Sequence, residues 1–146
     1  MREVFVDTAF WVARLSPRDN FHQAANAWPK ACAKYPLVTT DSVLNEVQTF
    51  FAEYGAVFRT HAARFVETLE NDPNVVILSD HEYMRQGRQL YKDRPDKGYS
   101  MADCLSMVVM KARGIQCVLT ADHHFQQEGF TALLLLSPSA ARDYLP

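Results

Sequence analysis

Asp103 lies in the first turn of a segment whose other side chains are almost all apolar. From residue 101 to residue 112 the apolar groups cover nearly the whole circumference of a helix, which is typical of a buried helix. A buried carboxylate is costly unless a cation or several hydrogen bonds accompany it. Two explanations are open. Ser100 and Asp103 fit a capping box at a helix N-terminus, or Asp103 holds a ligand together with other acids.

Three other acids stand at comparable places. Asp7 follows a short apolar run, Asp122 follows another, and Glu46 falls one turn into a helix, at the border between its apolar and polar faces. Each has a simpler interpretation, because Asp7 and Asp122 fit helix caps and Glu46 fits a solvated side chain. The question is whether the fold brings the four acids together.

Alternating short apolar strands and longer helices predict an α/β fold. We expect a three-layer α/β/α single domain over residues 1–146, with a parallel sheet of about five strands and no firm structure over 137–146. Strands are expected at residues 4–7, 37–40, 75–78, 115–120 and 132–136. Helices are expected at residues 8–15, 20–34, 41–55, 56–70, 80–91, 101–112 and 122–129, with Asp41 and Ser42 capping the third and Ser79 and Asp80 the fifth. Ligands of such sheets bind at the carboxyl ends of the strands, where Asp7, Glu46, Asp103 and Asp122 can converge.

Four neighbouring carboxylates raise one another's pKa, and a hard divalent cation relieves the repulsion. Oxygen ligands without thiolate or clustered imidazole favour Mg²⁺ or Mn²⁺, which also take phosphate oxygens. The chemistry indicated is phosphodiester hydrolysis, with one or two ions activating water and stabilising the leaving oxygen. Thr8 and Ser100 are placed to orient carboxylates or waters around the ions.

Composition limits the alternatives. The chain has 146 residues and 48% hydrophobic residues, which suit one domain with one core. The three cysteines include no Cys-x-x-Cys pair, which argues against a disulfide framework or a zinc knuckle and favours small core residues. No apolar run is long enough for a signal peptide or a membrane span, so we expect a cytoplasmic protein without membrane contact. The formal net charge of −2 leaves any nucleic-acid binding to local patches.

Four segments, taken in order, resemble the PIN-domain ribonucleases, and within them the VapC-type toxins of toxin–antitoxin pairs. They are residues 4–11, 39–46, 96–106 and 119–125. The resemblance implies a compact α/β/α domain, a Mg²⁺- or Mn²⁺-dependent endoribonuclease site and frequent homodimers. By position, Asp7, Glu46, Asp103 and Asp122 match the family's acids, while Thr8 and Ser100 match its hydroxyl residues. Some members carry a further acid just after the fourth, where this chain has His123 and His124, which we interpret as surface residues of a helix.

An RNA substrate requires basic residues around the acidic site. Arg85, Arg88 and Lys92 share one helical face, and Arg94 and Lys97 follow in the loop that leads to Ser100. We expect Arg88, Lys92, Arg94 and Lys97 to contact phosphates; an ordinary solvated face is the alternative.

Further partners are a second copy of the chain and an antitoxin protein. The second to fourth expected helices are rich in aromatic residues, some of which have room to face such a partner although core packing is the default: Phe21, Trp28, Phe50, Phe51, Tyr54 and Phe58.

Two other function classes are open. A PIN-like module that binds RNA or protein without cutting is disfavoured by the presence of all four acids. A phosphotransfer or receiver protein on a similar sheet usually has paired acids near the first strand, and the sequence after Asp7 offers no second acid there.

Overall fold

Five parallel strands form the centre of the molecule, in the order β3-β2-β1-β4-β5. The computed structural model describes residues 2–145, apart from the side chain of Ala141. The strands are β1 (Val4–Val6), β2 (Leu37–Thr40), β3 (Val75–Leu78), β4 (Cys117–Leu119) and β5 (Thr131–Ala132). β1 pairs with β2 through Val4 and Leu37, and with β4 through Phe5 and Val118. Because every pairing is parallel, the carboxyl ends of the strands lie along one edge of the sheet.

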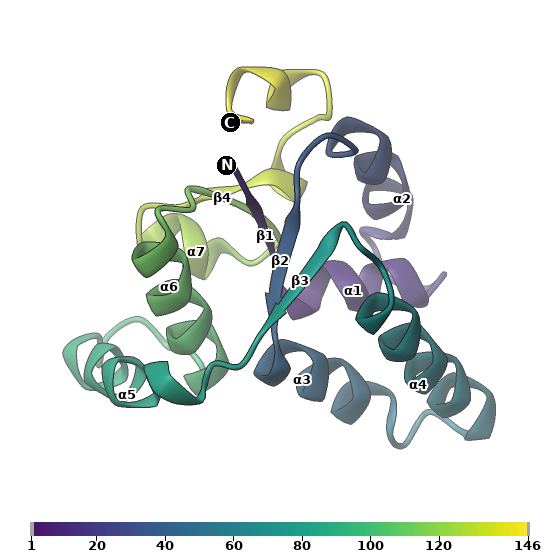
Figure 1. Cartoon of the computed structure of the whole chain (residues 1–146), viewed down its shortest axis with the longest axis horizontal. Helices are drawn as coiled ribbons and strands as arrows, with labels where there is room; N and C mark the ends of the chain where they lie inside the picture. Colours follow the sequence, from purple (N-terminus) through teal and green to yellow (C-terminus); the bar gives the residue numbers. More distant parts are fainter. Residues whose placement is uncertain (1, 146) are drawn as a thin grey trace.

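Helices cover both faces of this sheet, as Figure 1 shows, with α1, α2 and α4 on one side and α6 and α7 on the other. The helices are α1 (Thr8–Leu15), α2 (His22–Ala31), α3 (Asp41–Phe51), α4 (Ala56–Glu70), α5 (Met84–Asp93), α6 (Met101–Arg113) and α7 (His123–Gln127). The three-layer α/β/α architecture predicted from the sequence is therefore confirmed. Burial explains the sequence pattern, since the three residues of β1 and of β4 are all buried between the two helical layers.

The hydrophobic core joins the central strands to both helical layers. Phe5, Trp28, Phe51, Phe125 and Met107 are among its largest fully buried side chains. All three cysteines are free and buried, so the expectation of small core residues is confirmed. Within the described residues, no helix is long and apolar enough to cross a membrane.

Three local predictions were wrong. The side chain of Thr40, not of Asp41 or Ser42, caps α3 by accepting from the Val43 amide at 3.3 Å. Ser79 and Asp80 do not cap a helix; a short 3₁₀ turn, His81–Tyr83, leads into α5 instead. β5 has two residues because the chain then turns into the 3₁₀ segment Leu133–Leu135, where the Leu134 amide bonds to the carbonyl of Thr120.

Other boundaries shift at the ends of elements. α2 is shorter than expected and retains Pro29 inside it, close to its last turn. In the final segment, residues 137–145, the structure shows a 3₁₀ turn at Ala140–Asp143 and a hydrogen bond from the Cys117 thiol to the carbonyl of Tyr144 at 2.9 Å. These contacts place the segment beside the amino end of β4.

Candidate active site

A cleft of about 570 Å³ opens where β1 and β4 end and α3 and α6 begin. Five acidic side chains line it, and no lysine or arginine is among its lining residues in the described part of the chain. The acids are Asp7, Asp19, Glu46, Asp103 and Asp122. The structure therefore brings the four acids selected from the sequence into one cleft and adds Asp19, whose carboxylate also accepts the Phe21 amide at 2.8 Å.

Asp7 is the most deeply buried of these acids, at 5% exposure. Although it precedes α1, its side chain makes no capping hydrogen bond to that helix, so capping does not explain why an acid stands there. Burial and the neighbouring charge of Asp103 raise the pKa of Asp7 to about 7. The raised pKa means that the negative charge of Asp7 is disfavoured by its burial and by the neighbouring carboxylates.

Thr120 connects the acids at the ends of the two central strands. Its hydroxyl donates to Oδ2 of Asp7 at 2.9 Å and accepts from the backbone amide of Asp122 at 3.1 Å. The hydroxyl is fully buried, which fixes its geometry. Thr120 was not among the residues selected from the sequence, although it stands two residues before Asp122.

Asp103 caps α6 and also lines the acid cleft. Its carboxylate accepts the Ser100 amide and its own amide donates to the Ser100 hydroxyl, both at 3.0 Å, so the capping box is present. The same carboxyl group lines the acid cleft. Burial, together with the charge of Asp122, raises its pKa even though the Ser100 hydrogen bonds and His124 act in the opposite direction. The hydrogen bonds with Ser100 therefore orient the Asp103 carboxylate but bring no positive charge to it.

Glu46 reaches the cleft from α3. Its Oε2 accepts a hydrogen bond of 2.6 Å from the hydroxyl of Thr8, at the start of α1. Thr8 therefore holds a carboxylate from a different helix beside Asp7, the residue that precedes it. Glu46 is half-buried, as expected for a residue at the border of the apolar face of α3.

Asp122 and His124 complete the cleft from the amino end of α7. Asp122 caps this helix, because its Oδ1 accepts the His124 amide at 2.9 Å. The ring of His124 turns toward the acids, and its Nδ1 lies 3.2 Å from Asp122 Oδ1 and 3.5 Å from Asp103 Oδ2. The interpretation of His124 as a surface residue was therefore wrong, whereas His123 is exposed as expected.

A family model described as "PIN domain" matches residues 4–130 of the chain. The chain belongs to the PIN domain family. This PIN domain resembles the solved structure of Mycobacterium tuberculosis VapC20, described as a sarcin-ricin loop cleaving toxin. The two have 26% sequence identity and a TM-score of 0.79 over 90% of this chain and 98% of the other.

A second solved structure, FitAcB from Neisseria gonorrhoeae, has the same fold. Its TM-score is 0.62 at 18% identity, over 93% of this chain and 98% of the other. No curated protein sequence is significantly similar to the chain.

PIN domains generally bind a divalent metal. The donor set of this PIN domain fits such an ion, because carboxylate oxygens are what Mg²⁺ and Mn²⁺ prefer. The buried Nδ1 of His124, which has no hydrogen-bond partner among the described residues, is a further feature that a bound cation would satisfy.

The basic residues expected to contact RNA have different environments. Arg88 and Lys92 are exposed on α5 and form no ion pair among the described residues. Arg85 is exposed on the same helix, and Lys97 lies 3.5 Å from the exposed carboxylate of Asp96.

Arg94 is a partly exposed residue whose guanidinium is paired with a buried carboxylate. Its Nε and Nη2 donate to the two carboxylate oxygens of Glu128, each at 3.0 Å. Lys111 and Tyr99 donate to the same carboxylate. Burial alone would raise the pKa of Glu128, but these hydrogen bonds hold it below its ordinary value. Arg94 thus serves a structural pair, and its charge is largely committed to Glu128.

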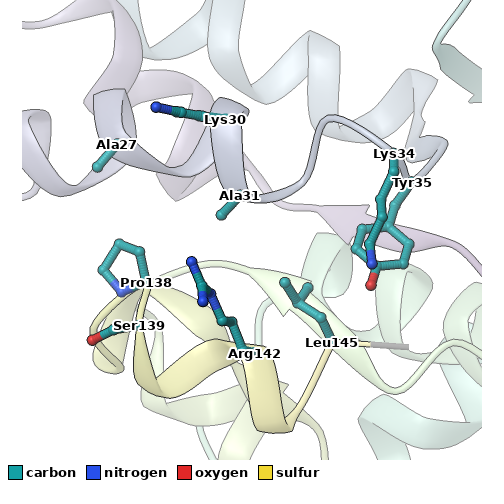
Figure 2. A pocket seen from close by; sticks show the side chains of 9 residues that line it. All are labelled: Ala27, Lys30, Ala31, Lys34, Tyr35, Pro138, Ser139, Arg142 and Leu145. Atoms are coloured by element: carbon teal, nitrogen blue, oxygen red, sulfur yellow. The ribbon is translucent and has the colours of Figure 1, made fainter.

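A separate cavity of about 610 Å³ lies between α2 and the C-terminal segment. Figure 2 shows Ala31 and Lys30 on the α2 side and Arg142 extending toward them from the opposite side. The cavity shares no residue with the acid cleft and has no acidic side chain in its described lining, so the two are separate features of the surface.

Proposed function

We propose that this PIN domain is a divalent-metal-dependent endoribonuclease that hydrolyses RNA phosphodiester bonds. The observation that carries the proposal is the convergence of four carboxylates from the end of β1, α3, α6 and the start of α7 in one cleft that has no lysine or arginine among its described lining residues. The similarity to VapC20, described as a sarcin-ricin loop cleaving toxin, supports a cleavage reaction.

Asp7, Glu46, Asp103 and Asp122 are the residues proposed to hold Mg²⁺ or Mn²⁺ and to be essential for catalysis. When bound, such an ion supplies positive charge that lowers the pKa of a water molecule and stabilises charge on the phosphate. The carboxylates themselves must be ionised to bind it, which for Asp7 requires displacement of a proton near neutral pH.

The hydroxyl groups of the cleft serve as positioning groups. Thr8 fixes Glu46, Ser100 fixes Asp103, and Thr120 fixes the relation between Asp7 and Asp122. Such fixed ligands favour a site that is organised before the ion and the RNA arrive. The cleft also repels phosphate until an ion is bound, which makes RNA binding and metal binding interdependent.

RNA contacts outside the cleft are assigned to Arg88, Lys92 and Lys97. Gly98 and Ser100 line the cleft, so the loop carrying Lys97 reaches its rim from the end of α5. Arg94 does not contact RNA in this proposal. Its ion pair with Glu128 fixes the start of the loop beside the end of α7.

The proposal includes a biological setting, in which the protein is the toxin of a toxin–antitoxin pair and forms a homodimer. Exposed apolar side chains at the junction of α3 and α4 support a protein partner there: Phe50 is 44% exposed, Tyr54 58% and Val57 67%. A second copy of the chain is the occupant that we propose, and an antitoxin protein is a further partner.

The test is RNA cleavage by the purified protein with Mn²⁺ or Mg²⁺. Asp7→Asn and Asp103→Asn are expected to lower the cleavage rate by at least about a hundredfold, since each removes a ligand charge. Glu67→Gln, which removes the charge of an exposed acid on α4, is the matched control and is expected to cleave normally. Thermal unfolding shows whether the variants fold. Metal-independent cleavage by the wild type, or full activity of either cleft variant, would refute the proposal.

A further inference from the structure

The imidazole of His124 presents a nitrogen atom to the acid cleft. Its Nδ1 is buried and has no hydrogen-bond partner among the described residues. It lies 3.2 Å from Oδ1 of Asp122 and 3.5 Å from Oδ2 of Asp103. A buried nitrogen atom therefore lies close to one carboxylate oxygen of Asp122 and one of Asp103.

The surroundings of the ring hold it in this orientation. The His124 amide is tied to Asp122 in the first turn of α7, and the next residue, Phe125, is fully buried. The ring of Tyr99 packs edge-on against the imidazole, with centroids 5.4 Å apart. On the opposite edge, Nε2 lies near Gly98, where an added Cβ would be 3.8 Å away.

The distances fit the edges of a coordination shell. Ligand atoms about 2.1 Å from a six-coordinate divalent ion lie roughly 3 Å from one another when adjacent. The separations from Nδ1 to the two carboxylate oxygens are close to this value. Neither contact is a hydrogen bond, so Nδ1 has no partner among the described residues that it must give up before it binds an ion.

We infer that His124 supplies a nitrogen ligand to the ion held by Asp103 and Asp122, so that the cleft selects a first-row transition ion such as Mn²⁺ over Mg²⁺. The inference rests on the proposed metal-dependent function and specifies its ion. The chemical reason is that imidazole nitrogen suits transition ions, whereas Mg²⁺ takes oxygen ligands and keeps its waters.

His123 provides a matched control from the same turn of α7. Its Nδ1 is 3.8 Å from Oδ1 of Asp122, but its side chain is 67% exposed, compared with 23% for His124. The two rings have the same chemistry and lie 4.5 Å apart, so a general effect of removing an imidazole would affect both variants alike.

The experiment uses the full chain without a histidine tag and Mn²⁺ as the probe. Pulsed electron paramagnetic resonance of the Mn²⁺ complex is expected to show ¹⁴N coupling from one imidazole in the wild type and in His123→Ala, and none in His124→Ala. Competition between Mn²⁺ and Mg²⁺, followed by titration, gives the selectivity. His124→Ala is expected to lower the Mn²⁺/Mg²⁺ affinity ratio about tenfold or more, and His124→Asp to lower it similarly by offering oxygen in place of nitrogen.

Each outcome bears on the inference. Mn²⁺ bound by the wild type without ¹⁴N coupling overturns it, even if RNA is cleaved, and leaves the proposed function intact. Equal loss of coupling in both histidine variants also overturns it, because the ligand would then not be His124 alone. A wild type that binds no divalent ion and cleaves no RNA contradicts the inference and the proposed function together. If His124→Ala does not fold, His123→Ala decides the point, because coupling that persists in this variant cannot come from His123, the other imidazole beside Asp122.

Discussion

Thr8 donates a 2.6 Å hydrogen bond to Glu46, a residue 38 positions away in the chain. Thr8 follows Asp7 directly, so one turn of backbone supplies both an acid of the cleft and the group that orients a second acid. The first strand and the third helix are thereby connected through the site itself. This contact leads to the first prediction.

Thr8→Val is expected to lower metal-dependent RNA cleavage by about ten- to a hundredfold, because Glu46 loses the group that orients it. Thr8→Ser keeps the hydroxyl and is expected to restore most of the rate. Cleavage rates at saturating Mn²⁺, together with the Mn²⁺ dissociation constant, measure the effect. Thr49→Val, an exposed threonine of α3, serves as the control. Equal activity of Thr8→Val and the wild type would show that Glu46 needs no support from Thr8.

The stability of the metal-free protein is expected to fall as the pH rises from about 4 to about 7. In this window the folded protein binds more protons than the unfolded chain, because the pKa of Asp7 is raised from 3.8 to about 7. Ionisation of Asp7 is expected to lower the free energy of unfolding by about 4 kcal/mol in total. Above pH 7 this contribution is fully lost, so the free energy of unfolding no longer changes with pH on its account. Glu128, whose pKa is lowered from 4.5, has the opposite effect, and only at lower pH.

Chemical unfolding in EDTA at several pH values measures this dependence. Asp7→Asn is expected to flatten the dependence of the free energy of unfolding on pH, because it removes the titrating group. At pH 8 this variant is expected to be more stable than the wild type but inactive, because asparagine keeps the oxygen that accepts from Thr120 without the negative charge. Saturating Mn²⁺ is expected to remove most of the loss near pH 7. A wild-type curve that is flat or rises between pH 5 and 7 would contradict the raised pKa.

Charge reversal on α5 tests the proposed RNA contacts. Arg88→Glu/Lys92→Glu, in an Asp103→Asn background, is expected to weaken binding of single-stranded RNA and to reduce the slope of log affinity against log salt by about 1.4 for two lost phosphate contacts. Fluorescence anisotropy at several salt concentrations gives both quantities. Arg59→Glu/Arg64→Glu makes the same change of charge on exposed residues of α4 and is expected to leave the slope nearly unchanged. Similar effects of both pairs would mean that overall charge, not α5, attracts RNA.

Tyr54→Ser/Val57→Ser is expected to convert the proposed homodimer to a monomer, because these side chains are the most exposed apolar groups at the junction of α3 and α4. Light scattering coupled to gel filtration gives the molecular mass. Tyr91→Ser, which removes a similarly exposed ring from α5, is expected to leave the dimer intact. A wild type that stays monomeric at high concentration would remove the dimer from the proposal.

The sequence by itself determined the features that depend on neighbouring residues and on general rules of topology. The capping box joins Ser100 and Asp103, which are three positions apart, and the alternation of strands and helices places Asp7 and Asp122 at the same edge of a parallel sheet. The helical spacing put Glu46 at the border of the apolar face of its helix, and the resemblance to PIN domains matched it to one of the family's acids. These inferences required periodicity, capping chemistry and strand direction, all of which are local or generic.

Tertiary structure decided how the side chains meet. The hydrogen bond from Thr120 to Asp7 joins residues 113 positions apart, and the pair of Arg94 with Glu128 spans 34 positions. The inward orientation of His124 depends on Tyr99 and on the burial of Phe125. A pattern of residue types cannot give such contacts, because they follow from packing between elements whose relative positions are fixed only when the whole core has formed. The same packing placed an imidazole nitrogen beside two carboxylates, where the sequence indicated a surface residue.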